Sequence, residues 1–360
     1  MQLLWDVLEN FLAKNFLHPS ENYTLSLSHR NLSHSHHVNV HWPLSHSHHV
    51  NAQATKAPAI RQLSELFTGN RVRKLKPYFR SPALTQAYIA YFLPLTFHKV
   101  KFLLKDNKEV LCPSEKILKI IDFGCGPASA VIALLFELAE KKYSYERIEI
   151  DLVDKENSIL PIGQALVEKF AKKLKLPVWV NIFTHIPPKK YHLSFATNVL
   201  NELEAFDNDP LLELWDVTLK YMLILEPSHR VSSQKLIRFR KRILQQNNPN
   251  IQVLSPCCHA EACPLYRTKH WCHFSEPVED ERLISLNRRI FKNPRLWLKF
   301  SYLVLKRAPY LPWDKKSYRA IGDVHLSQGK WAIDLCQPNQ KKIWFIKNPK
   351  SIKRGALTKI

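Results

Sequence analysis

A short β-branched segment that ends in two closely spaced glycines constrains the fold of this chain more than any other feature. The segment covers residues 119–124, Gly124 and Gly126 close it, and the almost uninterrupted apolar stretch 128–141 follows. This order predicts a strand, a tight turn and a helix N-terminus, where glycine lets a cofactor approach the backbone closely. The chain has only 7 glycines in 360 residues, far below the usual ~7%. Two of them at one turn therefore favour a cofactor-binding turn.

The acidic residues of the first two strands indicate which cofactor binds. Asp122 lies in the first strand, and the next predicted strand, 147–154, ends in Asp154. In a doubly wound sheet this second carboxylate lies over the cofactor crevice and can accept hydrogen bonds from both ribose hydroxyls. The turn has no third glycine where a pyrophosphate would press on the helix, which favours S-adenosylmethionine over a dinucleotide. The alternative for Asp154 is an ordinary strand-end carboxylate that caps a helix.

Three further predicted strands, 178–183, 192–200 and 221–225, extend the same sheet. The expected fold class is therefore α/β, with a doubly wound, Rossmann-like core of the class I methyltransferase type. Asn198 and Glu202 lie at the end of the second of these strands, where a substrate would enter beside the cofactor. A helix N-terminal acid is the alternative for Glu202, and no catalytic base stands out. The expected cofactor site consists of Asp122, Gly124, Gly126, Asp154, Asn198 and Glu202.

The segment from Pro256 to Phe274 holds the densest group of metal-ligand side chains. Four of the seven cysteines lie there, together with His259 and His273. In a reducing compartment such a group predicts ligands for zinc or an iron–sulfur cluster before it predicts disulfides. Spacings of C-x5-C and C-x8-C match neither a zinc ribbon nor a ferredoxin, so the metal stays open, and buried thiols that only fill space are the alternative. The residues are Cys257, Cys258, His259, Cys263, Cys272 and His273.

The charge balance predicts a polyanionic partner. Lys and Arg number 53 against 31 Asp and Glu, a formal net charge of +22. Such an excess favours nucleic acid, above all where basic residues gather with aromatic ones, as in 71–80, 238–242 and 341–354. A solvated basic surface is the alternative. No apolar stretch reaches the roughly 18–20 residues of a membrane span, and residues 1–16 predict an amphipathic helix and not a signal peptide, so no membrane partner is expected.

A Ser/His/Asn-rich tract occupies residues 18–56. It contains Leu-Ser-His-Ser-His-His-Val-Asn twice, at 32–39 and 44–51. Its low complexity predicts disorder. A duplicated linker is the favoured interpretation, and loose binding of zinc or nickel is the alternative. From 59 to 104 the apolar pattern becomes helical, and Pro94 is expected to interrupt it.

Several short motifs, in order between residues 83 and 346, carry a resemblance to a known family. They are Asp-Phe-Gly-Cys-Gly-Pro at 122–127, Asn-Val-Leu-Asn-Glu-Leu at 198–203, Leu-Glu-Pro at 225–227, Pro-Cys-Cys-His at 256–259, Cys-Pro-Leu at 263–265 and Trp-Cys-His-Phe-Ser at 271–275. In this order the chain resembles the methyltransferase-like family of small-ribosomal-subunit assembly factors of bacteria and mitochondria. The pairing of Cys-Pro-Leu with Trp-Cys-His-Phe is the most specific part, because the glycine turn alone indicates only an adenosylmethionine-type fold.

The resemblance implies a four-iron four-sulfur (4Fe-4S) cluster on four cysteines. Carried over by position, its ligands are Cys257, Cys263, Cys272 and Cys336. The spacing agrees in part, since three local thiolates leave one coordination position open and Cys336 lies in a β-rich tail that can close it. His259, His273 and Cys258 remain competing fourth ligands, and zinc remains the alternative metal. Cys258 stands where the family usually has proline.

The resemblance also implies a function. It indicates a small-ribosomal-subunit biogenesis factor that binds ribosomal RNA, with S-adenosylmethionine as cofactor and RNA methylation as an open question. A catalytically inactive RNA-binding assembly factor stabilised by a metal cluster is the alternative, and a DNA-directed methyltransferase with a zinc module is a third reading. Ala128 and Ser228 stand where the family has glycine, which bears on cofactor affinity. We expect a monomer that binds the small-subunit RNA or particle, cytoplasmic in a bacterium and in the mitochondrial matrix in a eukaryote.

The same observations divide the chain into segments. They are a short helix with a His/Ser-rich arm (1–58), a helical lead-in (59–114), a methyltransferase core (115–250), a cysteine-rich insertion (251–280), a completion of the core with an antiparallel strand at 297–306 (281–308) and a β-rich basic tail (309–360).

Overall fold

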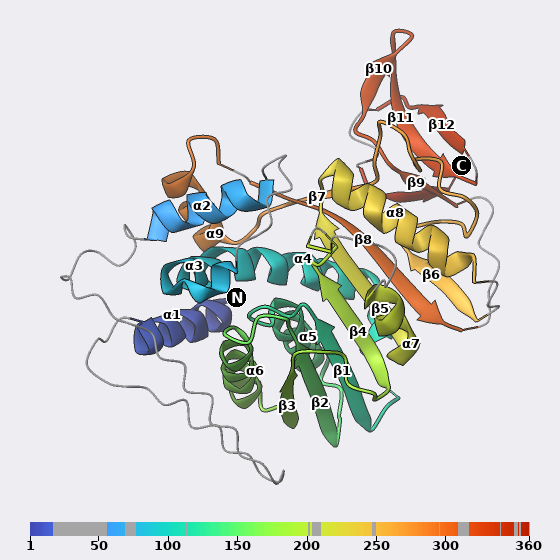
Figure 1. Cartoon of the computed structure of the whole chain (residues 1–360). Coiled ribbons are helices and arrows are strands. Elements are labelled where there is room, and N and C mark those ends of the chain that lie inside the picture. The colour runs from blue at the N-terminus through green and yellow to red at the C-terminus, as the bar shows by residue number, and fades with distance from the viewer. Residues whose placement is uncertain are drawn as a thin grey trace.

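The computed structural model contains a central sheet with helices on both faces and a second, smaller sheet formed by the C-terminal part of the chain (Figure 1). None of the helices that it describes combines the length and the apolar composition needed to cross a membrane. The His-rich tract, the basic residues 71–76 and Asn201 lie outside the described part of the chain. The described residues are 1–16, 56–68, 77–112, 114–200, 202–203, 210–246, 250–294, 296–308, 317–338, 340–348, 352 and 354–359.

The central sheet is built from strands β1 (Ile117–Phe123), β2 (Arg147–Val153), β3 (Val178–Phe183), β4 (Tyr191–Thr197), β5 (Thr218–Pro227), β6 (Ile251–Ser255), β7 (Phe274–Pro277) and β8 (Trp297–Arg307). Their order is β3-β2-β1-β4-β5-β8-β6, with β7 also paired to β8. The first five strands pair in parallel, whereas β8 runs antiparallel to its neighbours. This order confirms the doubly wound class I methyltransferase core and the predicted antiparallel strand. The switch point, where a crevice opens at the carboxyl ends, lies between β1 and β4.

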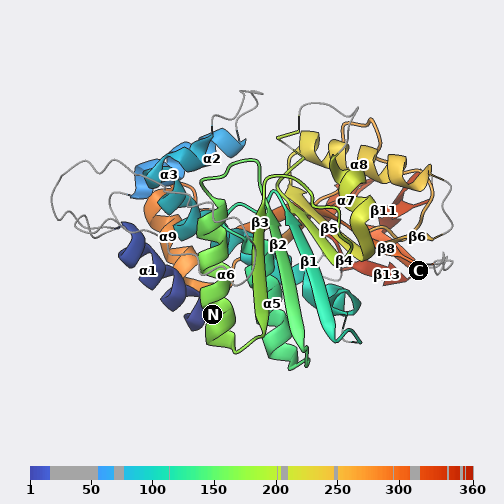
Figure 2. The same cartoon turned by 60° about the horizontal axis from the view of Figure 1, so that its bottom comes forward.

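Alternation along the strands supplies a hydrophobic core on each face of this sheet. In β1, Leu118 and Ile120 join one core and Ile121 joins the other, as the two-residue period of a strand requires. One layer of helices covers the first face and another covers the second (Figure 2). The first layer is α4 (Leu93–Asp106), α5 (Ser129–Lys141) and α6 (Leu160–Leu174), and the second is α7 (Pro210–Val217) and α8 (Arg230–Leu244).

Four further helices extend the first layer: α1 (Gln2–Phe16), α2 (Lys56–Thr68), α3 (Pro82–Ala87) and α9 (Glu281–Ile290). The predicted amphipathic helix at the N-terminus is therefore present, and it packs against α3 and α6. A buried hydrogen bond fixes it, because the indole of Trp5 donates to the Asp280 carboxylate at 2.9 Å. Asp280 also caps α9 by accepting the backbone N–H groups of Arg282 and Leu283. One buried carboxylate thus joins segments that lie 275 residues apart.

The expected interruption at Pro94 was wrong. Pro94 lies in the first turn of α4, and the chain passes into it from α3 through a π-helical turn, Tyr88–Phe92. Proline is tolerated in a first turn because it has no N–H to donate. The wider π-turn leaves space for the proline ring, so the chain continues helical through this point.

The C-terminal part of the chain forms the second sheet. Its strands are β9 (Ser317–Ala320), β10 (His325–Ser327), β11 (Lys330–Gln337), β12 (Gln340–Phe345) and β13 (Leu357–Lys359). Its described strands pair antiparallel, and Ile333 and Leu335 form its small core with Ala320. It lies beside α8, β6 and the loop 256–273, which connects β6 to β7 (Figure 1). The β-rich tail expected from the sequence is thus present, and it brings Cys336 of β11 toward the cysteine-rich loop.

Candidate cofactor crevice and candidate metal centre

The glycine turn lies at the carboxyl end of β1 and is fastened to β2. The N–H groups of Gly124 and Cys125 donate to the Val153 carbonyl at 2.8 and 3.0 Å. Gly124 and Gly126 have φ of +67° and +50°, in the left-handed region that favours glycine. A Cβ on Gly124 would lie 2.6 Å from Cγ2 of Val199. This glycine is therefore required by packing of the β4 loop, independently of any cofactor.

Asp154 supports the turn through both of its carboxylate oxygens. Oδ2 accepts the N–H of Gly126 at 2.9 Å, and Oδ1 accepts the N–H of Glu156 at 3.0 Å. Burial raises the pKa of this carboxyl, and the two hydrogen bonds oppose that rise. Each carboxylate oxygen can accept two hydrogen bonds. The carboxylate keeps one acceptor position per oxygen for a ligand in the crevice.

Asp122 is buried without compensation. It has no exposed surface, and neither oxygen has a hydrogen-bond partner among the described residues. Burial and the nearby charge of Asp154 raise its pKa well above the usual range. An unpaired buried carboxyl is expensive. This orphaned group is the clearest local sign that the crevice is complete only with a bound ligand.

The loop after β4 is held by a residue that the sequence analysis did not assign to the site. Glu226, at the end of β5, accepts the N–H groups of Val199 and Leu200 on Oε1, both at 2.9 Å. The preceding residue, Asn198, has φ of +62°. Burial raises the pKa of Glu226 to about 8. The sequence did contain a signal for this role. Glu226 is an acid at the end of a predicted strand, as Asp154 is.

Glu202 lies beside a group of packed aromatic rings at the carboxyl ends of the strands. Its carboxylate lies 3.1 Å from Nζ of Lys155 and 3.5 Å from the hydroxyl of Tyr78. Tyr78 packs on Phe79, with ring centroids 4.4 Å apart, and Phe79 covers the turn so closely that a Cβ on Gly126 would meet its ring at 3.5 Å. The sequence analysis assigned both aromatics to a basic surface cluster. The structure places them over the glycine turn instead.

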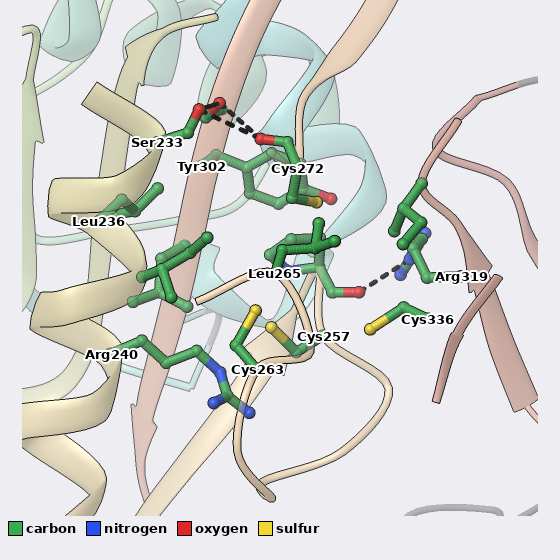
Figure 3. Close-up of a pocket in the computed structure, with 15 residues that line it drawn as sticks. Ser233, Leu236, Arg240, Cys257, Cys263, Leu265, Cys272, Tyr302, Arg319 and Cys336 are labelled. Carbon is green, nitrogen blue, oxygen red and sulfur yellow. Dashed lines mark hydrogen bonds between the residues drawn. The ribbon is translucent and has the colours of Figure 1, made fainter. Parts of the chain in front are cut away.

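The predicted metal ligands come together around one cavity. Cys257, Cys263 and Cys272 reach it from the loop 256–273, and Cys336 reaches it from β11. Figure 3 shows Cys257 and Cys263 side by side, with Cys336 opposite and Cys272 above. The cavity has a volume of about 40 Å³. Its other lining residues are Ser233, Leu236, Ile237, Arg240, Pro256, Leu265, Ser301, Tyr302, Leu303, Arg319 and Ile321.

Two arginines shape this cavity through the backbone of the loop. Arg240 of α8 donates to the carbonyls of His259 and Glu261 at 2.6 and 2.9 Å. Arg319 of β9 donates to the Pro256 carbonyl at 2.8 Å. A cationic fork that holds two carbonyls fixes an irregular segment better than a single donor does. The loop is therefore positioned from both the core and the tail.

Burial raises the pKa of two of the four thiols. Burial raises the pKa of Cys263 to about 11, and it raises that of Cys272 further. A buried thiol loses its proton readily when a metal ion takes the proton's place. Of the competing ligands, His273 does not line the cavity and stacks on Trp271 instead. Cys258 and His259 do not line it either.

Comparison with protein families gives a direct assignment. A family model described as mitochondrial small ribosomal subunit Rsm22 matches residues 82–348. The chain belongs to the Rsm22 family. The region matched by the Rsm22 model contains the glycine turn, the β4 loop and all four cysteines of the cavity. No curated protein matches the chain.

Solved structures match the chain only at low identity and low TM-score. Magnesium protoporphyrin IX methyltransferase from Synechocystis with bound SAH is 11% identical, with a TM-score of 0.36 over 70% of this chain and 95% of that one. The same enzyme with bound SAM is 12% identical, with a TM-score of 0.36 over 69% and 97%. YjhP from E. coli is 10% identical, with a TM-score of 0.33 over 69% and 99%. Matches at this level do not indicate a function for this Rsm22 family member.

Proposed function

We propose that this protein is a small-ribosomal-subunit biogenesis factor that binds S-adenosylmethionine and carries a 4Fe-4S cluster. The observation that carries the proposal is the convergence of four cysteine side chains from two distant segments on one cavity, in a chain of the Rsm22 family. Its ligands are Cys257, Cys263, Cys272 and Cys336. The partner is small-subunit ribosomal RNA or the particle that contains it.

The donor set and the space both support a cluster. Four thiols without a nearby carboxylate suit iron–sulfur or zinc. A cavity of about 40 Å³ exceeds the ~10–15 Å³ that a single water-sized atom needs. A single zinc ion would draw the sulfurs to about 2.3 Å from it and would leave no such space between them. The cavity therefore favours a group of several atoms.

The cluster would serve as a cross-link. Cys336 is the only one of the four that belongs to the tail sheet, and the other three belong to the loop between β6 and β7. Metal binding to such a set adds directly to folding free energy, because the unfolded chain has no preformed site. When bound, the cluster also supplies a redox-active centre. The chain's own residues orient the loop that holds it, through Arg240 and Arg319.

The crevice supports S-adenosylmethionine as the second ligand. Asp122 is a buried carboxylate without a partner among the described residues, which suits a cationic ligand. Asp154 keeps free acceptor positions for ribose hydroxyls, and Gly124 and Gly126 form the turn without side chains. Asn198 and Glu202, on the loop held by Glu226, border the place where a substrate would enter. The proposed contacts are made by Asp122, Gly124, Gly126, Asp154, Asn198 and Glu202.

The positive charge of the chain supports an RNA partner. A net charge of +22 favours association with phosphate groups in a salt-dependent manner. We propose that the protein acts as a monomer, in the mitochondrial matrix where its source is a eukaryote. Co-sedimentation with small ribosomal subunits tests this partner. Binding that persists undiminished in high salt, or that is equal for an unrelated RNA of the same length, would contradict it.

A second candidate function is RNA binding without methyl transfer. It is favoured by Phe79, which is packed on Tyr78 and lies over the turn where a cofactor would approach. Transfer of a labelled methyl group from S-adenosylmethionine to small-subunit RNA distinguishes the two functions. Labelled RNA supports the enzyme, and a bound cofactor without labelled RNA supports the inactive factor.

Anaerobic purification followed by iron, sulfide and zinc quantitation tests the metal. We expect a brown protein with about four iron and four sulfide per chain. Cys263→Ser should lose the iron. Cys112→Ser is the matched control, because Cys112 is buried away from the cavity and its thiol bonds the Val110 carbonyl at 3.4 Å. A colourless protein with one zinc, or an iron-loaded Cys263→Ser variant, would overturn the cluster.

A further inference from the structure

Two side chains beside the four-cysteine cavity belong to no function described so far. Cys258 and His259 follow Cys257 directly, yet neither lines the cavity. Both are buried, at 4% relative exposure each. Their donor atoms point to Cys336, the ligand that the tail contributes. The thiol of Cys258 lies 3.4 Å from the Cys336 carbonyl, and Nε2 of His259 lies 3.3 Å from the Cys336 sulfur.

We infer that Cys258, His259 and Cys336 form a second metal site, of the zinc type, that shares Cys336 with the four-cysteine cavity. One ligand atom from each of the three lies within 4.8 Å of the other two, and all three residues are buried. Donors of one tetrahedral zinc lie roughly 3.5–3.8 Å apart, given Zn–S near 2.3 Å and Zn–N near 2.0–2.1 Å. The site is therefore close to the required geometry before any metal binds.

The donor chemistry and the surroundings select the metal class. Two sulfurs and one imidazole suit zinc and other borderline divalent ions, and they leave one position for a water molecule. Arg240 holds the backbone of this segment by donating to the His259 carbonyl at 2.6 Å, so the imidazole is positioned in advance. Binding a divalent ion releases two protons, one from each thiol, because a neutral imidazole offers a lone pair.

Sharing one sulfur makes the two sites exclusive. When Cys336 binds a cluster in the cavity, the trio lacks its third donor. When the cluster is absent, Cys336 is free to bind zinc with Cys258 and His259, and the tail stays cross-linked to the loop through a different metal. The second site can exist whether or not the cavity ever holds a cluster. A test of the trio is therefore independent of the proposed function.

Cobalt binding to the full-length, reduced and metal-free protein tests the trio. The informative variant is Cys263→Ser, which breaks the four-cysteine set and keeps the trio. We expect it to bind one Co²⁺ with the absorption of a tetrahedral ion and the charge-transfer intensity of two thiolates, and added Zn²⁺ should displace it. Adding Cys258→Ser to this variant should abolish the band. Adding His259→Gln should weaken binding by at least about tenfold, since even outer-shell changes cost 10–100-fold.

Three results would overturn the second site. One is a Cys263→Ser variant that binds no Co²⁺ while its circular dichroism remains that of the wild type. Another is a band that survives Cys258→Ser, which would assign the metal to Cys257, Cys272 and Cys336. The third is a charge-transfer intensity of three or four thiolates. The His259→Gln substitution removes no further thiol from the Cys263→Ser variant, so it decides the matter even where the added Cys258→Ser prevents folding.

Discussion

Gly124 and Gly329 adopt nearly the same backbone conformation for different reasons. Their φ angles are +67° and +71°. A Cβ on Gly124 would lie 2.6 Å from Val199, whereas a Cβ on Gly329 would meet no atom within 4 Å. The first glycine is required by conformation and by packing, and the second by conformation alone. Comparison of the two glycines therefore separates the energetic cost of a left-handed backbone from the cost of a packing clash, which usually occur together.

Replacement of each glycine by alanine measures this difference. Both variants lose about 1–2 kcal/mol for the left-handed conformation. Gly124→Ala should lose about 1–3 kcal/mol more, because the side chain of Val199 must move out of a packed position. Urea unfolding of the two variants gives the two values. Equal losses would show that the β4 loop yields freely and does not fix this turn.

The buried carboxyl of Glu226 makes stability depend on pH. Burial raises its pKa to about 8 in the folded protein, whereas it is near 4.3 when the chain is unfolded. The folded state holds the Glu226 proton more tightly than the unfolded state does. The contribution of this proton to stability is therefore complete below about pH 4 and is lost as the pH rises toward and through 8.

Glu226→Gln should remove this dependence. Between pH 5 and 8 the wild type should lose about 2–4 kcal/mol relative to the variant, since the glutamine oxygen still accepts the two N–H groups of the loop and carries no charge. Unfolding curves at several pH values test this, with the exposed Glu213→Gln as control. A constant difference between wild type and Glu226→Gln across this range would contradict it.

At the scale of elements, the loop 256–273 depends on the helix beside it. Arg240 binds two carbonyls of the loop with one guanidinium group. Arg240→Lys cannot keep both hydrogen bonds, so we expect the free energy of unfolding to fall by about 1–3 kcal/mol. We also expect faster loss of the bound metal to a chelator. Arg238→Lys, an exposed position on the same helix, is the matched control. Equal rates of metal loss in both variants would show that Arg240 does not fix the loop.

The sequence predicted most elements of the core and fewer of the contacts between them. β3 was predicted with its observed bounds, because an apolar strand next to polar turns shows its two-residue period clearly. The helical continuation through Pro94 was missed, since the π-turn depends on packing with the neighbouring helices. Asp154 and the four cysteines could be named from position and resemblance. The location of Tyr78 and Phe79 could not, because it depends on how α3 and α4 fold back over the crevice.

At the scale of the whole molecule, the tail sheet has a small core and depends on its link to the loop. Ala320, Ile333 and Leu335 form its small buried cluster, while the central sheet has an extensive core on each face. Chelation of the metal should therefore raise amide exchange in β9, β11 and the loop 256–273 by at least about tenfold.

Strands β1 to β5 should exchange at unchanged rates, because none of them contributes a cavity ligand. Hydrogen–deuterium exchange with mass spectrometry of the full chain, with and without metal, measures both regions at once. Cys112→Ser, treated in the same way, controls for the loss of a thiol. Uniform changes over the whole chain, or no change in β11, would contradict a cross-linking role.

The position of β8 between β5 and β6 also constrains the order in which the strands can pair during synthesis. β6 pairs only with β8 among the described strands, and β8 is synthesised later. Residues 251–255 therefore leave the ribosome without a partner in the sheet, and the cysteines that follow them stay open to solvent. The fourth cysteine emerges last, at residue 336 of 360. The proposed metal centre can therefore be completed only after β11 has been made, and a chain truncated before β11 would keep its core sheet and lack the fourth cysteine.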